Sequence, residues 1–216
     1  MKILVVDDHA LVREGLRHVL TGLDEQVEVL QAAQCAHAFE LAALHADIDL
    51  VLLDYHLPDM SGLEALDVFG SRHPELPVVV LSGAPSPLMM RQVVTRGAAG
   101  FLSKSSISDE LLSALRRVLA GEVLGAPEIA TTDGQADASN AETTGSNPEL
   151  SRRQEEVLYL LLDGYSSRAI SEKLFLSEET TKSHVSAIIH AFGVKSRLQA
   201  VLAAGRYGYG KTAPPS

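Results

Sequence analysis

The chain has 216 residues and a formal net charge of −10, which is enough length for two small domains. Its one cysteine, Cys35, excludes an internal disulfide framework and a cysteine-based zinc site, which suits a reducing compartment. The N-terminal apolar run is too short for a signal peptide, and no run approaches the roughly 18 apolar residues of a membrane span. We therefore expect a cytoplasmic protein that has no membrane partner.

The charge is distributed unevenly along the chain. Residues 1–120 hold 9 basic against 16 acidic side chains, residues 121–148 hold 0 against 5, and residues 149–216 hold 9 against 7. Such asymmetry is expected when only one part of a chain meets a polyanion. Nucleic acid is therefore a candidate partner for the C-terminal part.

Residues 1–120 alternate short apolar runs with amphipathic segments. Five runs read as strands buried on both faces, and they cover residues 2–6, 27–30, 50–53, 77–81 and 100–103. Helices are expected to follow them, over residues 11–20, 36–46, 63–69, 86–95 and 108–119. Ser86 before Pro87, and Ser108 before two acids, are helix-start signals. The alternation predicts an α/β domain with a parallel sheet covered on both faces.

Polar residues stand where four of the five expected strands end: Asp7 with Asp8, then Asp54, Ser82 and Lys104. In open α/β sheets, ligands gather beyond the carboxyl ends of the strands. Three neighbouring carboxylates repel one another unless a cation is present, and a site with few, oxygen-only protein ligands suits Mg²⁺. With the metal bound, Asp54 would be an ionised nucleophile toward a phosphoryl group. Lys104 and the Ser82 hydroxyl would then stabilise the phosphoryl oxygens.

Simpler interpretations of these residues remain open at this point. Asp7 and Asp8 could cap a helix, and Ser82 could be a turn former. The histidines at positions 9, 18, 37 and 56 are expected at the surface rather than as metal ligands, because no pair has metal-site spacing with a third partner. Cys35 is expected to be inert.

Residues 121–148 are rich in Gly, Ala, Thr, Asp, Ser and Asn and have no helical or strand period after Ile129. Such a segment buries too little surface to order itself, so we predict a flexible, acidic linker. From residue 149 to the end the pattern is helical, with starts at Ser151, Ser166 or Ser167, Ser177 and Ser196. The short turn at residues 175–177 predicts a helix-turn-helix. The chain after Gly205 is expected to fray.

Four segments of the N-terminal part resemble the receiver domain of bacterial two-component response regulators: VVDD at 5–8, LDYHLPDMSG at 53–62, LSG at 81–83 and GFLSK at 100–104. The resemblance covers residues 1 to about 120 and implies a flavodoxin-like (βα)5 fold. It implies that Asp54 accepts a phosphoryl group from a histidine kinase. It further implies that Asp7, Asp8, Asp54 and the backbone carbonyl of His56 hold Mg²⁺.

By the same resemblance, Ser82 and Phe101 form a conformational switch; the alternative for Phe101 is an ordinary core residue. One departure follows Lys104, where many receivers have a proline after a cis peptide and this chain has Ser105. A cis bond before serine costs about 3 kcal/mol more than the trans form, so the geometry of that peptide is left open.

The C-terminal segments LSRRQEEVL at 150–158, SEETTKSHV at 177–185 and GVKSR at 193–197 resemble the LuxR-type helix-turn-helix of NarL/FixJ response regulators. This resemblance covers nearly all of residues 149–204. The helix from Glu178 would present Lys182, Ser183 and Ser186 to a major groove, and His184, Lys195 and Arg197 would contact phosphates. The alternative is a solvated polar face on a small helical bundle. Gln154, Ala169 and Ala191 depart from the usual charged residues of the family.

These observations favour a transcription regulator rather than an enzyme: phosphorylation of Asp54 would release or dimerise the DNA-binding unit. A homodimer on an inverted-repeat site of double-stranded DNA is expected in the active state. One alternative is a regulator whose receiver serves only for protein interaction, independently of phosphorylation. Another is an Asp-nucleophile phosphatase, which needs a second acid two residues after the nucleophile, where this chain has His56.

Overall fold

The computed structural model describes residues 1–209 except 25, 107–108, 120–123 and 125–147. Its N-terminal domain is a single parallel sheet, in the order β2-β1-β3-β4-β5. The strands are β1 (Lys2–Val6), β2 (Glu28–Ala32), β3 (Leu50–Asp54), β4 (Val78–Ser82) and β5 (Gly100–Ser103). The expected five parallel strands are confirmed, with β2 ending two residues later than predicted. The strand order reverses between β1 and β3, which is where ligand sites form in such sheets.

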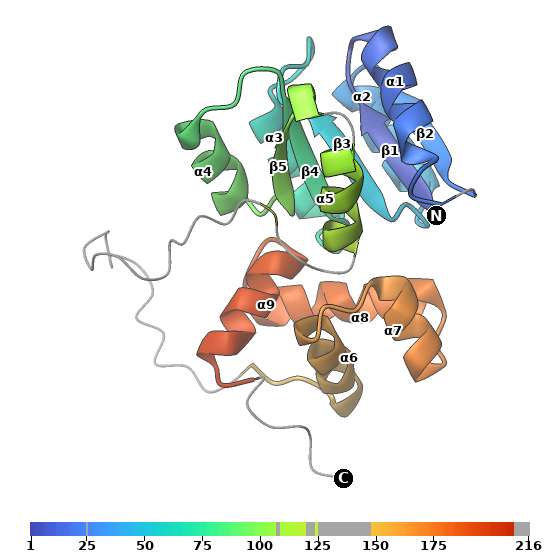
Figure 1. Cartoon of the computed structure of the whole chain (residues 1–216). Coiled ribbons are helices and arrows are strands. Elements are labelled where there is room, and N and C mark those ends of the chain that lie inside the picture. Colours follow the sequence, from blue (N-terminus) through green and yellow to red (C-terminus); the bar gives the residue numbers. More distant parts are fainter. Residues whose placement is uncertain (25, 107–108, 120–123, 125–147, 210–216) are drawn as a thin grey trace.

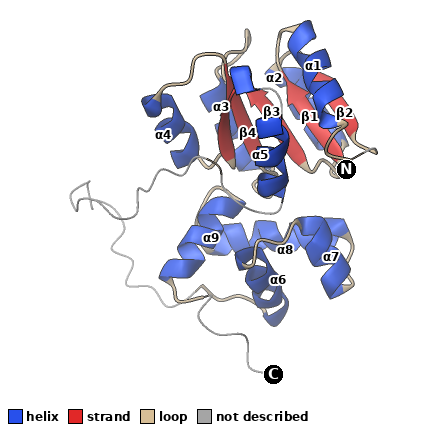
Figure 2. Cartoon of the chain, in the orientation of Figure 1, coloured by secondary structure: helices blue, strands red, loops and turns tan. Residues whose placement is uncertain are grey.

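In the described part of the chain, five helices cover the two faces of this sheet (Figure 2). They are α1 (Ala10–Leu20), α2 (Cys35–Leu44), α3 (Gly62–Arg72), α4 (Pro87–Thr95) and α5 (Asp109–Leu119). Successive residues of a strand point to opposite faces. Thus Leu4 packs in one core cluster with α2, α3 and α4, whereas Ile3 packs in the other with α1 and α5.

The connection after β5 bears on the geometry that the sequence left open. A short 3-10 turn, Lys104–Ser106, follows the strand directly. The described residues contain no cis peptide bond, so the bond between Lys104 and Ser105 is trans. Ser108, the expected cap of α5, lies outside the described residues.

The C-terminal domain consists of the helices α6 (Arg152–Leu162), α7 (Ser167–Leu174), α8 (Glu178–Ala191) and α9 (Arg197–Arg206). A serine caps the N-terminus of each by accepting a backbone amide hydrogen bond: Ser151, Ser166, Ser177 and Ser196. The four helices enclose a separate apolar core. The expected fraying after Gly205 is wrong for the first residues, because Tyr207 and Tyr209 pack against Phe192.

Most of the predicted linker falls outside the described residues. Within it, Leu124 is buried against the N-terminal core, and its amide donates to the Ala99 carbonyl. None of the helices in the described ranges has both the length and the apolarity that crossing a bilayer requires.

Candidate functional site

Pairing of neighbouring strands brings the predicted acids together. β1 pairs with β3 in the register Val6↔Leu53, so Asp7, Asp8 and Asp54 emerge side by side at the carboxyl edge. Asp7 and Asp54 are buried, with 0% and 2% of their surface exposed, whereas Asp8 is open to solvent. Oxygen atoms of all three acids and Nδ1 of His9 lie within 4.8 Å of one another.

Lys104 bridges the two buried acids. Its Nζ lies 2.7 Å from Asp7 Oδ2 and 2.7 Å from Asp54 Oδ2. Burial works against the charged ammonium, but the contacts with Asp54 and Asp7 outweigh it and leave the pKa of Lys104 raised. Lys104 is therefore a fixed positive charge at this edge of the sheet.

The surroundings of Asp54 disfavour its ionised form. Burial raises the pKa of its carboxyl group, and the contacts with Lys104 and with the His56 amide, 3.2 Å from Oδ1, offset this only in part. An ionised Asp54 is thus poorly solvated within the fold. A further cation that binds beside this carboxylate would stabilise its ionised form.

Of the two predicted switch residues, Ser82 lies at the same edge of the sheet as this cluster, and Phe101 lies inside the neighbouring strand. Ser82 ends β4 and is buried, and its hydroxyl accepts a hydrogen bond from the Ala84 amide. Phe101 in β5 is 5% exposed and packs in the core cluster that includes Val93 of α4. The structure therefore joins Phe101 to α4 through the core.

The donor set at this edge meets the requirements of a hard divalent cation. Three carboxylates offer oxygen atoms close enough to share one ion, and Mg²⁺ prefers such ligands. His9, which was expected at the surface, has an exposed side chain, and its Nδ1 lies 2.6 Å from Asp8 Oδ1 and 3.2 Å from Asp7 Oδ1.

The predicted DNA-contacting residues of α8 face the N-terminal domain. Nζ of Lys182 donates to the carbonyl oxygens of Ala46, at 2.6 Å, and Ile48, at 3.0 Å. Ser183 and Ser186 line a pocket shared with residues of α2 and α3. The Ser183 hydroxyl donates to the Glu179 carbonyl of its own helix, and His184 is partly buried.

The start of α9 makes further contacts between the domains. The Arg197 amide donates to the Pro74 carbonyl at 3.3 Å, and Nε2 of Gln199 donates to the Thr95 carbonyl at 3.1 Å. The Arg197 guanidinium points into its own domain, where it donates to the Tyr165 carbonyl and to Ser167 Oγ. Burial lowers the pKa of Arg197 to about 10. Lys195 is exposed.

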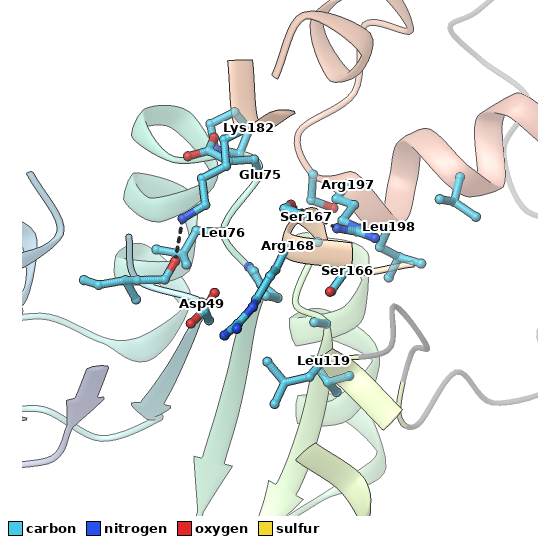
Figure 3. Close-up of a pocket in the computed structure, with 18 residues that line it drawn as sticks. Asp49, Glu75, Leu76, Leu119, Ser166, Ser167, Arg168, Lys182, Arg197 and Leu198 are labelled. Carbon is cyan, nitrogen blue, oxygen red and sulfur yellow. Dashed lines mark hydrogen bonds between the residues drawn. The ribbon is translucent and has the colours of Figure 1, made fainter. Parts of the chain in front are cut away.

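A cavity of about 100 Å³ lies where the two domains meet. Figure 3 shows Lys182 and Arg168 from the helical domain and Asp49, Glu75 and Leu119 from the sheet domain around this cavity, with Arg168 directed toward Asp49. The loops that form this junction precede β3, β4 and β5, so it lies at the edge of the sheet opposite Asp54 (Figure 1).

Comparison with known proteins identifies both domains. Residues 3–116 match the response regulator receiver domain, and residues 148–204 match the bacterial regulatory proteins of the luxR family. The chain is a two-component response regulator. Its receiver and LuxR-type DNA-binding domain are of the NarL, DegU and NreC type, and its relatives are transcription regulators.

Relatives of this response regulator extend over its whole length. The glycerol metabolism activator of Pseudomonas putida is 37% identical over 209 residues, covering 94% of this chain and 95% of the relative. The transcriptional regulatory protein DegU of Brevibacillus brevis is 32% identical over 226 residues, covering 98% and 95%. A crystal structure of a LuxR-family response regulator from Aurantimonas sp. SI85-9A1 aligns with a TM-score of 0.55 at 29% identity, covering 60% of this chain and 91% of that one.

Proposed function

We propose that this response regulator is switched by transfer of a phosphoryl group from a histidine kinase to Asp54. The observation that carries the proposal is the ammonium of Lys104, 2.7 Å from both Asp54 and Asp7 at the carboxyl edge of the sheet. A carboxylate nucleophile needs a neighbouring positive charge to offset the phosphoryl oxygens, and Lys104 is placed to supply it. The Ser82 hydroxyl would donate to another phosphoryl oxygen.

Asp7, Asp8, Asp54 and the His56 carbonyl would hold Mg²⁺. When bound, the ion would neutralise charge on the phosphoryl oxygens. Lys104 would hold the Asp54 carboxylate in place, and it would keep its proton throughout because its pKa is raised. Buried Asp7 would keep Lys104 oriented between the two acids.

We further propose that the described arrangement is the resting state. Lys182, on the helix predicted to read DNA, donates two hydrogen bonds to the carbonyl oxygens of Ala46 and Ile48. The same ammonium cannot contact a base or a phosphate while it is bound there. Binding to DNA would therefore require the helical domain to leave the receiver.

The switch would connect the two edges of the receiver through α4. Phosphorylation would draw Ser82 toward the phosphoryl group and shift Phe101, which packs with Val93 of α4. The C-terminal end of α4 carries the Thr95 carbonyl that holds Gln199 of α9. A displacement of α4 would thus weaken a contact that keeps the domains together.

In the active state we expect a homodimer on an inverted-repeat site in double-stranded DNA, acting in the cytoplasm where the DNA lies. Lys182, Ser183 and Ser186 would read the major groove, with His184, Lys195 and Arg197 near the phosphates. Arg197 would do so only after changing its present partners, Tyr165 and Ser167.

The test compares the parent protein with Asp54→Asn and with Asp67→Asn, a surface acid of α3 paired with Arg96. Each is incubated with acetyl phosphate and Mg²⁺, weighed intact, and used to protect genomic DNA fragments from cleavage. The proposal predicts one added phosphoryl group and stronger protection for the parent and for Asp67→Asn, and neither for Asp54→Asn. DNA protection that is equal in all three proteins would instead favour a phosphorylation-independent regulator.

A further inference from the structure

Helix α2 begins without a cap from its own N-cap residue. Gln34 has the extended backbone of an N-cap residue, but its side chain makes no capping hydrogen bond. The first amides of a helix need an acceptor, and a negative charge there interacts well with the helix dipole. Asp59 supplies both: its Oδ1 accepts from the Cys35 amide at 3.2 Å and its Oδ2 from the Ala36 amide at 3.1 Å.

Asp59 belongs to the loop that follows Asp54, and the base of this loop is closed on itself. The Gly62 amide donates to the Tyr55 carbonyl at 2.9 Å, and a backbone bridge joins His56 to Ser61. Gly62 is required there, because a Cβ at this position would lie 2.7 Å from the Tyr55 Cα. The base of the loop is therefore closed by its own backbone, and the peptide between His56 and Leu57 leads from this base into the outer part.

The outer part of the loop has a different attachment. Leu57 and Met60 are only partly buried against the core, and Pro58 and Asp59 are exposed. The two bonds of Asp59 to α2 are directional and tie this part of the loop to a rigid element. They thereby restrict the backbone between Tyr55 and Ser61, which includes His56.

We infer that Asp59 is a positioning residue for the cation at Asp54. By anchoring the loop to α2, it holds the His56 carbonyl in the orientation from which it would bind Mg²⁺. This inference rests on the proposed function, because it assigns Asp59 a role in the same metal site. Asp59 does not itself reach the ion; it acts through the backbone of the loop.

The expected size of the effect follows from other metal-binding proteins, in which groups that orient a metal ligand have been removed. Removing a group that orients a metal ligand typically weakens metal affinity about 10- to 100-fold. Two residues, Leu57 and Pro58, separate Asp59 from His56, so we expect the lower end of this range, about a tenfold weaker Mg²⁺ affinity for Asp59→Ala. Asp59→Asn keeps one acceptor oxygen, which can cap one of the two amides, but its NH2 group cannot accept from the other, so it should recover only part of the affinity.

The experiment measures Mg²⁺ binding to the full chain by isothermal titration calorimetry. The variants are Asp59→Ala, Asp59→Asn and Ser86→Ala; the last removes the cap of α4 at the same edge of the sheet, where Ser86 accepts from the Met89 amide at 3.2 Å. Phosphorylation by acetyl phosphate is followed across a range of Mg²⁺ concentrations. The inference predicts that Asp59→Ala needs about tenfold more Mg²⁺ but reaches the parent rate at saturation.

Two results would overturn this inference, and they are distinguishable. If Asp59→Ala and Ser86→Ala both unfold at lower temperature while their Mg²⁺ affinity equals that of the parent, Asp59 is only a helix cap. If the parent protein itself neither binds Mg²⁺ nor takes up a phosphoryl group, the proposed function fails, and the positioning role fails with it. Weakened Mg²⁺ binding in Asp59→Ala, with partial recovery in Asp59→Asn, would support it.

Discussion

Gly97 offers a way to separate the docking of the two domains from DNA contact itself. It lies in the turn between α4 and β5, with a φ of +95°, and a Cβ added there would lie 2.8 Å from Ser196 Oγ and 3.0 Å from Ser196 Cβ. Carbon contacts normally lie near 3.5–4.0 Å. Gly97→Ala therefore forces the start of α9 away from the receiver, whereas the helix that would read DNA is left unchanged.

The magnitude follows from the contacts at this corner. The strain of alanine at positive φ, about 1–2 kcal/mol, is local to the receiver and is the same whether the domains are docked or apart. Only the docked state loses the bonds from Gln199 to Thr95 and from the Arg197 amide to Pro74, at about 1 kcal/mol each. A loss of about 2 kcal/mol shifts the docking equilibrium roughly 30-fold toward the separated state.

Fluorescence anisotropy with a duplex selected from a random pool would measure this shift. Because affinity scales with the fraction of protein that is competent to bind, unphosphorylated Gly97→Ala should bind up to about 30-fold more tightly than the parent. Gly193→Ala is the matched control, since Gly193 also has a positive φ, of +64°, but open space around it. Ser196→Gly added to Gly97→Ala should restore the parent affinity. If Gly97→Ala binds DNA no more tightly than the parent, the docked arrangement does not restrain DNA binding.

Three further predictions concern the receiver. Burial raises the pKa of Asp54, so the folded state favours the protonated carboxyl, and the stability that this group contributes is lost as the pH rises through its folded-state pKa. Asp54→Asn should therefore melt at a higher temperature than the parent at pH 7.5, and the difference in melting temperature should shrink toward pH 4. A lower melting temperature for Asp54→Asn at pH 7.5 would contradict this. Lys104→Met leaves two buried carboxylates without their cation, so calorimetry should show a free energy of unfolding that is roughly 1–3 kcal/mol lower and that added Mg²⁺ partly restores. An unchanged melting temperature of Lys104→Met in metal-free buffer would refute this prediction. Burial, with a smaller contribution from the charge of Asp59, raises the pKa of the Cys35 thiol to about 12, so iodoacetamide at pH 8 should label it only after unfolding, and rapid labelling of the native protein would count against that burial.

The fold was predictable because its determinants are local. Runs such as residues 50–53 are too short for a helix and too apolar for an exposed strand. Six of the helices that the structure describes, α3, α4 and α6 to α9, begin after a serine whose side chain caps them. Ser61 and Ser151 form capping boxes with Glu64 and Gln154, within three residues of sequence. Signals of this range can be read without knowledge of the tertiary structure.

The residues of the candidate site could be predicted from the sequence, but the contacts that hold them in place could not. Asp7, Asp54 and Lys104 stand at strand ends, and a parallel sheet brings strand ends to one edge. The cap that Asp59 gives to α2 joins residues 24 apart, and no local pattern indicates it. The histidine beside the acids was set aside because its spacing resembles no zinc site, although it directly follows Asp8.

Contacts between the domains could not be predicted either, because they also join residues that lie far apart in the sequence. Lys182 meets the Ala46 carbonyl 136 residues away, and backbone carbonyls carry no side-chain identity that a sequence could reveal. The polar face of α8 reads equally well as a DNA-binding surface or as a surface docked on the receiver. Only the placement of the domains assigns its present partner.

Hydrogen–deuterium exchange before and after phosphorylation tests most directly whether an event at Asp54 frees α8 at the far edge of the receiver. The full chain is compared with Asp54→Asn, each with Mg²⁺ and acetyl phosphate, and peptides covering residues 46–49, 95–97 and 178–191 are followed. If phosphorylation releases α8, exchange becomes faster in all three segments of the phosphorylated parent and does not change in Asp54→Asn. Unchanged exchange in a sample shown by intact mass to carry the phosphoryl group would contradict it.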